Sequence, residues 1–176
     1  MKRRNILGLS VIAALGLALL PGSALAQQKP LKEQLVGTWT AASWEQTSKD
    51  GTKFQRFGAN PKGVNVFDAN GRFFVMFARA DLPKFASNNP MKTTPEENKA
   101  VMEGTIAYYG TYTVDEMGKT VTLRVEASSF PNQVGSEQKR TITSLTASEL
   151  KLGNPTALTG GHIEYVMKRA STVVIN

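Results

Sequence analysis

The sequence predicts an all-β fold: an eight-stranded antiparallel up-and-down barrel with a short N-terminal helical turn and one short helix inserted mid-chain. The first observation is a series of short segments in which apolar and polar residues alternate, most clearly at residues 120–128. The second is the turn signals between these segments, such as Asp68-Ala69-Asn70-Gly71. The third is that consecutive segments form near-neighbour hairpins, and closing such a meander into a barrel leaves no exposed edge.

Residues 1–26 have the organisation of a secretory signal peptide and are set aside from the fold. A basic stretch at residues 2–4 precedes an apolar run at residues 6–20, and Ala24-Leu25-Ala26 is an A-x-A cleavage pattern. A membrane anchor is the alternative, but the run is shorter than the roughly 20 residues that a span needs. We therefore expect a periplasmic or secreted protein without a membrane span in its mature form, and a single domain at residues 27–176. The paired arginines leave both Sec and twin-arginine export open.

The domain is expected to begin with a helical turn at residues 30–35 and to enter its first strand at Gly37. On that strand Trp39, Ala41 and Ser43 share one face. A polar segment with a turn signal at Asp50-Gly51 follows. The eight strands are expected at residues 37–43, 64–67, 72–79, 106–114, 120–128, 138–145, 149–152 and 162–169.

One helix interrupts the series of strands. Thr94 suits the N-cap, Pro95 suits the first helical position, and two acidic residues occupy the first turn, so we expect a short helix to about Glu103. A long loop at residues 80–93 precedes it. Long loops in compact domains often cover binding sites, so we consider this insertion a candidate lid.

Charge and composition exclude several classes of function. The full chain has a net charge of +7, which falls to +4 when the signal segment removes three basic residues and no acid. The remaining charges are scattered, so the basic patch of a nucleic-acid-binding protein is missing. The chain has no cysteine and one histidine, whereas zinc sites and nucleophilic triads draw on these residues. We therefore expect no disulfide, no metal, no cofactor and no nucleic-acid partner. The oligomeric state stays open.

An ordered set of motifs spans nearly the whole mature chain. The set consists of Leu35-Val36-Gly37-Thr38-Trp39, Asn60-Pro61-Lys62-Gly63, Asn70-Gly71-Arg72-Phe73, Tyr108-Tyr109-Gly110-Thr111-Tyr112-Thr113-Val114-Asp115, Val125-Glu126, Phe130-Pro131-Asn132 and Gln138-Lys139-Arg140. With these motifs the chain resembles the bacterial and fungal lipocalin-like domain proteins, a calycin-related family. The resemblance implies a barrel whose cavity takes a small apolar or amphipathic molecule, and it implies no reaction. It also implies that Trp39 plugs the closed end while Arg169 or Lys168 packs over its ring.

Two strands supply aromatic and apolar candidates for ligand contact. On the strand at residues 106–114, Tyr108 and Tyr112 fall on one face and Tyr109 on the other. A tyrosine in a cavity offers apolar area and a hydroxyl that orients a ligand. The strand at residues 72–79 is apolar on both faces. We take from it Phe74 and Met76 as further candidates, with Arg79 placed to meet a carboxylate at the mouth or to pair with Asp81.

Three further polar residues complete the candidate ligand-binding set. Arg124 and Glu126 share one face of their strand, and they are polar anchors if that face is inward or a solvated pair if it is outward. Because Val121 and Val125 suit the core, the outward arrangement is favoured. His162 opens the last strand, either as a surface residue or as a candidate base or lone metal ligand.

The leading hypothesis is an exported lipocalin-like protein that binds a small hydrophobic or amphipathic molecule in its barrel. No catalytic residue is assigned. The first alternative is a cofactor-independent cyclase or isomerase that uses the cavity, with Tyr109, Glu126 and His162 as acid–base candidates. The second is an envelope interaction module that uses outer-face aromatic residues such as Trp44.

Overall fold

The computed structural model describes residues 29–157 and 160–171, so the predicted signal peptide and its cleavage site lie outside the described residues. The described part consists of antiparallel strands with two short α-helices and one 3-10 turn. In chain order these are α1 (Leu31–Leu35), β1 (Gly37–Thr47), β2 (Lys53–Phe54), β3 (Lys62–Phe67), β4 (Arg72–Ala78), α2 (Pro95–Gly104), β5 (Thr105–Asp115), β6 (Thr120–Ser128), η1 (Pro131–Gln133), β7 (Glu137–Leu145), β8 (Glu149–Asn154) and β9 (His162–Arg169).

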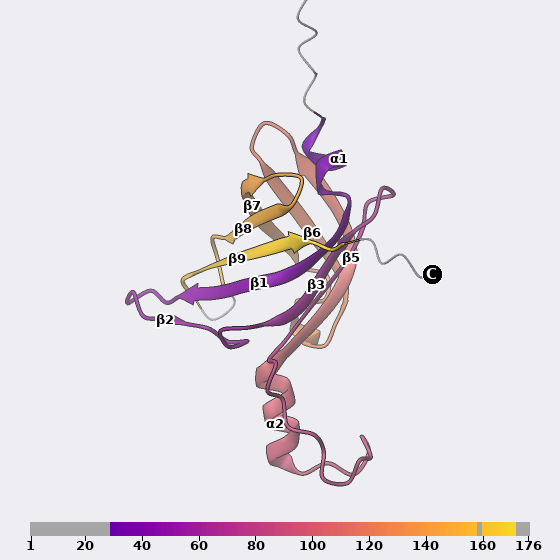
Figure 1. Ribbon diagram of the computed structural model, residues 1–176, viewed down its shortest axis with the longest axis vertical. Helices are drawn as coiled ribbons and strands as arrows, with labels where there is room; N and C mark the ends of the chain where they lie inside the picture. The colour runs from indigo at the N-terminus through magenta and orange to yellow at the C-terminus, as the bar shows by residue number, and fades with distance from the viewer. Residues whose placement is uncertain (1–28, 158–159, 172–176) are drawn as a thin grey trace, which may run out of the picture.

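The strands form a closed up-and-down barrel, which confirms the predicted fold class. Each of β3 to β9 pairs with its neighbour in sequence, β1 pairs with β3, and the ring closes where β1 pairs with β9 from Trp39–Arg169 to Thr47–His162. The short strand β2 pairs only with the end of β1 and extends the sheet beside the ring. Figure 1 shows α1 at one end of the barrel and α2 projecting from the other.

The main difference from the expected strands lies in β1 and β2. We expected the first strand to end near residue 43, but β1 continues to Thr47 because its pairing with β9 extends to Thr47. A β-bulge between Ala41 and Ser43 breaks the alternation of the strand, so Trp44 and Gln46 face inward. The turn at Asp50-Gly51 then returns the chain as β2.

The closed end of the barrel is built around Trp39, which is fully buried. Its indole Nε1 donates to the carbonyl oxygen of Leu35 at 2.8 Å, and the guanidinium carbon of Arg169 lies 4.0 Å from the indole ring centroid. Gly37 leaves room for this stacking, since a Cβ atom there would lie 2.6 Å from Nη1 of Arg169. Of the two basic residues proposed for this role, Arg169 performs it, and Lys168 pairs with Glu149 instead.

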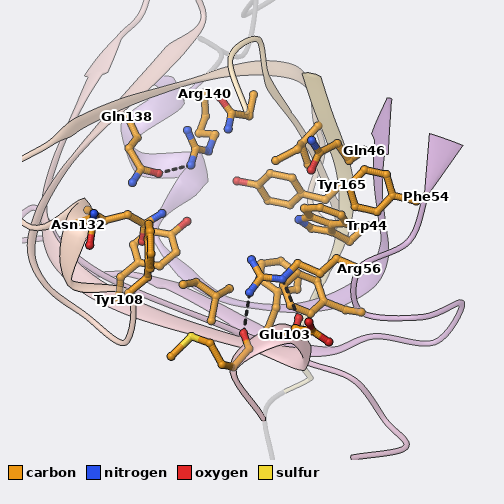
Figure 2. Close-up of a pocket in the computed structure, with 18 residues that line it drawn as sticks. Trp44, Gln46, Phe54, Arg56, Glu103, Tyr108, Asn132, Gln138, Arg140 and Tyr165 are labelled. Atoms are coloured by element: carbon orange, nitrogen blue, oxygen red, sulfur yellow. Dashed lines mark hydrogen bonds between the residues drawn. The ribbon is translucent and has the colours of Figure 1, made fainter. Parts of the chain in front are cut away.

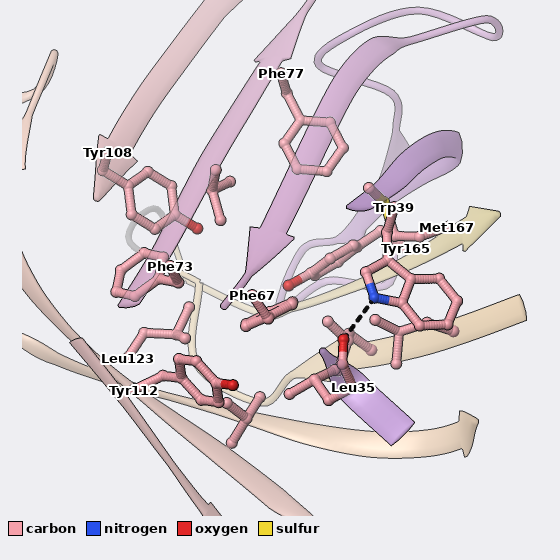
Figure 3. Close-up of a cluster of buried hydrophobic side chains, with 14 of the residues drawn as sticks. Leu35, Trp39, Phe67, Phe73, Phe77, Tyr108, Tyr112, Leu123, Tyr165 and Met167 are labelled. Atoms are coloured by element: carbon pink, nitrogen blue, oxygen red, sulfur yellow. Dashed lines mark hydrogen bonds between the residues drawn. The ribbon is translucent and has the colours of Figure 1, made fainter. Parts of the chain in front are cut away.

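The inner faces of the strands form one continuous apolar core that begins at this plug and extends into the barrel. In Figure 3 the rings of Phe67, Phe73, Phe77, Tyr108 and Tyr112 converge inside the barrel. Phe67 and Tyr112 meet edge to face at 5.1 Å between ring centroids, as do Phe73 and Tyr108 at 5.8 Å. Such pairs stabilise a core by about 0.5–1.5 kcal/mol beyond the area they bury. The core fills the part of the barrel next to α1 and leaves the other end hollow.

Candidate binding cavity

A cavity of about 670 Å³ is lined in part by Met102 and Glu103. These residues belong to α2, which projects from the end of the barrel away from α1 (Figure 1). The mouth of the cavity is bordered by β2, by the segment that follows β2, and by the last turn of α2. Residues of seven strands, β1, β2, β4, β5, β7, β8 and β9, line the cavity. The lining residues are Trp44, Gln46, Phe54, Arg56, Phe57, Phe77, Met102, Glu103, Ile106, Tyr108, Phe130, Asn132, Gln133, Gln138, Arg140, Asn154, Ile163 and Tyr165.

Aromatic side chains form one wall of the cavity. Trp44 contacts Phe57 edge to face at 5.0 Å between ring centroids, and Phe57 stacks on Phe77 at 5.4 Å. Phe54 extends this cluster to the mouth, with its ring 6.4 Å from that of Trp44. This wall provides the apolar surface that a small hydrophobic ligand requires.

Trp44 is not on the outer surface, so its proposed use as an outer-face aromatic of an interaction module was wrong. Its side chain is 7% exposed and lines the cavity. Strict alternation from Trp39 through Ser43 would place Trp44 outside the barrel. The bulge between Ala41 and Ser43 reverses that alternation, because one extra residue shifts every later side chain to the opposite face.

The opposite wall is polar and centres on Arg140, whose side chain is 6% exposed. Its Nη2 donates to Oε1 of Gln138, and its Nη1 donates to the carbonyl oxygen of Lys139 at 3.0 Å. Figure 2 shows the hydroxyls of Tyr108 and Tyr165 pointing toward this side of the cavity. Burial alone would lower the pKa of Arg140, but its interactions with Tyr108 and Tyr165 outweigh burial and raise it. Arg140 is therefore a buried cation at neutral pH.

The groups around Arg140 leave hydrogen-bonding capacity unused. Burial raises the pKa of Tyr165 to about 12, so its hydroxyl stays neutral and does not balance the charge of Arg140. Nε2 of Gln138 is buried without a hydrogen-bond partner among the described residues. Asn65 lies close enough to Tyr165 to affect its pKa, yet neither polar atom of the Asn65 side chain makes a well-aligned hydrogen bond. Buried polar groups are normally satisfied, so this cluster needs an explanation.

Arg56 joins the mouth of the cavity to α2. Its Nε donates to the carbonyl oxygen of Glu103 at 2.9 Å, and its Nη2 donates to those of Met102 and Thr105, both at 3.0 Å. These carbonyls lie at the C-terminal end of the helix, where a cation is favourable. The guanidinium is half-buried, which lowers its pKa, and lies 5.1 Å from the ring centroid of Phe57. Arg56 therefore anchors the last turn of α2 at the mouth.

The candidate lid covers less of the cavity than we expected. Of the segment at residues 80–103, only Met102 and Glu103 line the cavity, and α2 runs outward from the barrel rather than across it. The helix itself is as predicted, with Thr94 as its N-cap and Pro95 in its first turn.

Of the nine candidate residues taken from the sequence, Tyr108 lines the cavity. Tyr112 shares a face with Tyr108, as the pattern predicted, and that face is the inner one. Tyr112 does not line the cavity and lies in the apolar core. Its hydroxyl donates to the carbonyl oxygen of Asp68 at 2.7 Å, so it secures the β3–β4 turn.

Three apolar candidates point outward and do not line the cavity. Phe74 is 37% exposed, Met76 is 40% exposed and Tyr109 is 44% exposed. Phe73, Val75 and Tyr108, the neighbours of these residues in sequence, take the inner face.

The charged candidates also lie outside the cavity. Arg124 is exposed on the outer face of β6, and Glu126 makes a bidentate ion pair with Arg72 at 2.8 Å and 2.9 Å. The favoured outward arrangement of these residues is therefore correct. Arg79 pairs with Asp81, also through two hydrogen bonds, and His162 is exposed at the start of β9.

Sequence reasoning missed the residues that give the cavity its character, namely Trp44, Arg56, Gln138, Arg140 and Tyr165. A signal was present for two of them. Gln138 and Arg140 alternate with Lys139 and Thr141, and they share a face with Ile142, which is buried. An arginine on the apolar side of a strand indicates a buried charge.

Among the described residues, no group of three or more acidic or histidine side chains is arranged to hold a metal ion. Within the same part of the chain, no helix has the length and apolarity needed to cross a membrane.

Comparisons with known proteins found similar solved structures and one family model. A lipocalin-like protein from Bacteroides uniformis is 14% identical, with 78% of this chain and 99% of that chain covered and a TM-score of 0.42. A redesigned β-barrel is 14% identical (82% and 98% covered, TM-score 0.43), and a de novo designed fluorescence-activating β-barrel is 12% identical (81% and 99% covered, TM-score 0.42). No curated protein matches the chain. The family model of the lipocalin-like domain matches residues 36–172, and the chain therefore belongs to the lipocalin-like domain family.

Proposed function

We propose that this protein is an exported carrier or sensor that binds a small amphipathic molecule in the barrel cavity. The observation that carries the proposal is the cavity of about 670 Å³, with an aromatic wall on one side and a buried polar cluster on the other. Ligand sites typically measure about 300–1,000 Å³, with mostly apolar walls and a few polar groups that orient the ligand.

Export is part of the proposal and rests on the signal-peptide pattern at residues 1–26. Cell fractionation followed by N-terminal sequencing tests it. We expect the mature protein outside the cytoplasm with Gln27 at its N-terminus. An unprocessed chain in the cytoplasm would contradict export and leave ligand binding untouched.

No observation favours the enzyme alternative. Tyr109, Glu126 and His162, the acid–base candidates, are exposed and do not line the cavity. General acid–base catalysis needs such groups within hydrogen-bond reach of a bound substrate. The proposal is therefore binding without a reaction.

A cavity-filling substitution tests the binding proposal. Ile163 is half-buried and lines the cavity, so Ile163→Trp places a large ring in the space for the ligand. We expect the wild type to bind the uncharged dye Nile red with enhanced fluorescence. We expect Ile163→Trp to bind it about tenfold more weakly or worse, which corresponds to ~1.4 kcal/mol.

The matched control is Met76→Trp, which adds the same ring at an outward position that is 40% exposed. It is expected to bind Nile red as the wild type does. Absence of binding by the wild type, or equal affinity in Ile163→Trp, would overturn the proposal. Native mass spectrometry of protein purified from its own host then identifies the natural ligand by its mass.

A further inference from the structure

We infer that the cavity selects molecules with a single carboxylate headgroup, which Arg140 binds, and an apolar body, which lies against the aromatic wall. This inference rests on the proposed function and adds the chemical class of the ligand. It starts from a charge that the ligand-free barrel does not balance. Arg140 is 6% exposed, and no acidic side chain among the described residues forms an ion pair with it.

The protein groups that Arg140 contacts are neutral. Arg140 donates to the Gln138 side-chain oxygen and the Lys139 carbonyl oxygen, and it interacts with the hydroxyls of Tyr108 and Tyr165. Burying an isolated charge is costly, and proteins normally pair such a charge or bind it to a partner. An anion from outside the chain is the partner that this position lacks.

The groups beside Arg140 present hydrogen-bond donors. The hydroxyl of Tyr165 keeps its proton, since burial raises its pKa to about 12, and the hydroxyl of Tyr108 points to the same region. Nε2 of Gln138 is a buried donor without a partner in the described part of the chain. A guanidinium surrounded by donors suits a group that only accepts hydrogen bonds, and an ionised carboxylate is such a group.

The amount of charge favours a carboxylate over a phosphate monoester. Among the described residues, Arg140 is the one cation on the polar wall of the cavity, which it forms with Gln138, Tyr108 and Tyr165. Its planar guanidinium can donate two parallel hydrogen bonds to a carboxylate. A phosphate monoester carries about −1.5 to −2 charges at neutral pH, which one guanidinium leaves partly uncompensated. Arg56, the other cation of the lining, is already bound to three carbonyl oxygens at the mouth.

The aromatic wall determines how the rest of the ligand lies. In Figure 2 Trp44 and Phe54 lie across the cavity from Gln138 and Arg140. Phe57 and Phe77 extend this wall through their ring contacts with Trp44 and with each other. A ligand whose headgroup meets Arg140 therefore places its apolar part against these rings, as a fatty acid or an aromatic carboxylic acid would.

Competition between ligands of equal chain length tests the inference. In this test, decanoate, decanol and decylamine each compete with Nile red for the wild type at neutral pH. The affinities of the three ligands are then compared. We expect decanoate to bind at least about tenfold more tightly than decanol, because a hydrogen bond to a charged group is worth this factor or more. Decylamine is expected to bind most weakly, since its charge meets a buried cation.

Two arginine variants assign the preference to one side chain. In Arg140→Met the preference for decanoate over decanol is expected to disappear, while decanol still binds. Arg124→Met makes the same change at an exposed outward position of β6, and it is expected to keep the preference.

The outcomes separate the two proposals. If Nile red and all three ligands fail to bind, the binding function itself is wrong. If Nile red and decanol bind but decanoate binds no better than decanol, binding stands and the carboxylate inference is overturned. The inference is also overturned if folded Arg140→Met keeps the full preference. If Arg140→Met does not fold, the comparison of the three ligands on the wild type decides.

Discussion

Arg169 is the residue at which several parts of the chain meet. Its guanidinium lies over the Trp39 ring and donates to carbonyl oxygens of Gln34, Val36 and Ala147 at 2.7–3.0 Å. The last strand is thereby connected to the helical turn, to the start of the first strand and to the β7–β8 turn. A planar guanidinium can stack and donate at the same time, which an ammonium group cannot do with the same geometry.

Replacing Arg169 is therefore expected to destabilise the barrel. Arg169→Met loses the cation–π contact and three hydrogen bonds, and we expect the free energy of unfolding to fall by about 2–4 kcal/mol. Chemical denaturation followed by tryptophan fluorescence measures it. Lys168→Met is the control, since the exposed ion pair of Lys168 with Glu149 is worth less than about 1 kcal/mol. Equal losses in both variants would contradict the role of Arg169.

At the scale of elements, α2 forms through its own N-terminal signals. Thr94 accepts a hydrogen bond from the Glu97 backbone N–H, and the Glu97 carboxylate accepts from the backbone N–H groups of Thr94 at 2.9 Å and Ala86 at 2.8 Å. These backbone hydrogen bonds hold the pKa of Glu97 below its ordinary value of 4.5, and the one from Thr94 has the largest effect. The local signals were readable because a capping box involves only neighbouring residues.

The capping box predicts a pH dependence of the start of α2. Because the folded pKa of Glu97 is lowered, its contribution is complete above the ordinary value of 4.5 and is lost as the pH falls through the lowered value. We expect the Thr94 amide resonance to shift over that acidic range in an NMR titration. The shift is expected to vanish in Glu97→Gln and to remain in Glu96→Gln. A Thr94 amide that titrates equally in all three proteins would contradict the capping role.

The β-bulge in β1 determines which side chains of that strand face the cavity. Strict alternation correctly placed Tyr108 and Tyr109 on opposite faces of β5, but it failed after Ala41 in β1. The bulge has no signature of its own in the residues of β1, because pairing with β9 decides where the extra residue sits. For this reason Trp44 was misplaced and the aromatic wall was not predicted.

For the whole molecule, the pairing of β1 with β9 closes the sheet into a barrel. β1 pairs with β9 over 8 residue pairs, although more than 100 residues separate the two strands in sequence. Closure leaves each strand of the ring with two neighbours, and it also encloses the cavity. A sheet without the β1–β9 pairing would expose the edges of β1 and β9, which are templates for association with other chains.

Removing the last strand is expected to abolish the monomeric barrel. A chain that ends at Gly161 lacks β9, and with it the buried Tyr165 and Met167. We expect it to aggregate or to lack native β structure in size-exclusion chromatography and circular dichroism. A chain that ends at Ser171 keeps β9 and is expected to behave as the full domain does. A monomeric, β-rich product from the shorter chain would show that closure is dispensable.

The sequence by itself determined the barrel class and the mid-chain helix, because alternation, turn residues and capping residues act over short distances. The plug at Trp39 was implied by the family resemblance, which left Arg169 and Lys168 as alternatives, and the structure decided for Arg169. Only the tertiary structure decided which side chains meet in the cavity. Arg140, Tyr165 and Trp44 lie on different strands, and their meeting depends on ring closure and on a bulge that shifts the pairing. The candidates taken from the sequence lay mostly on the outer face, because residue type alone does not reveal which side of a strand faces inward.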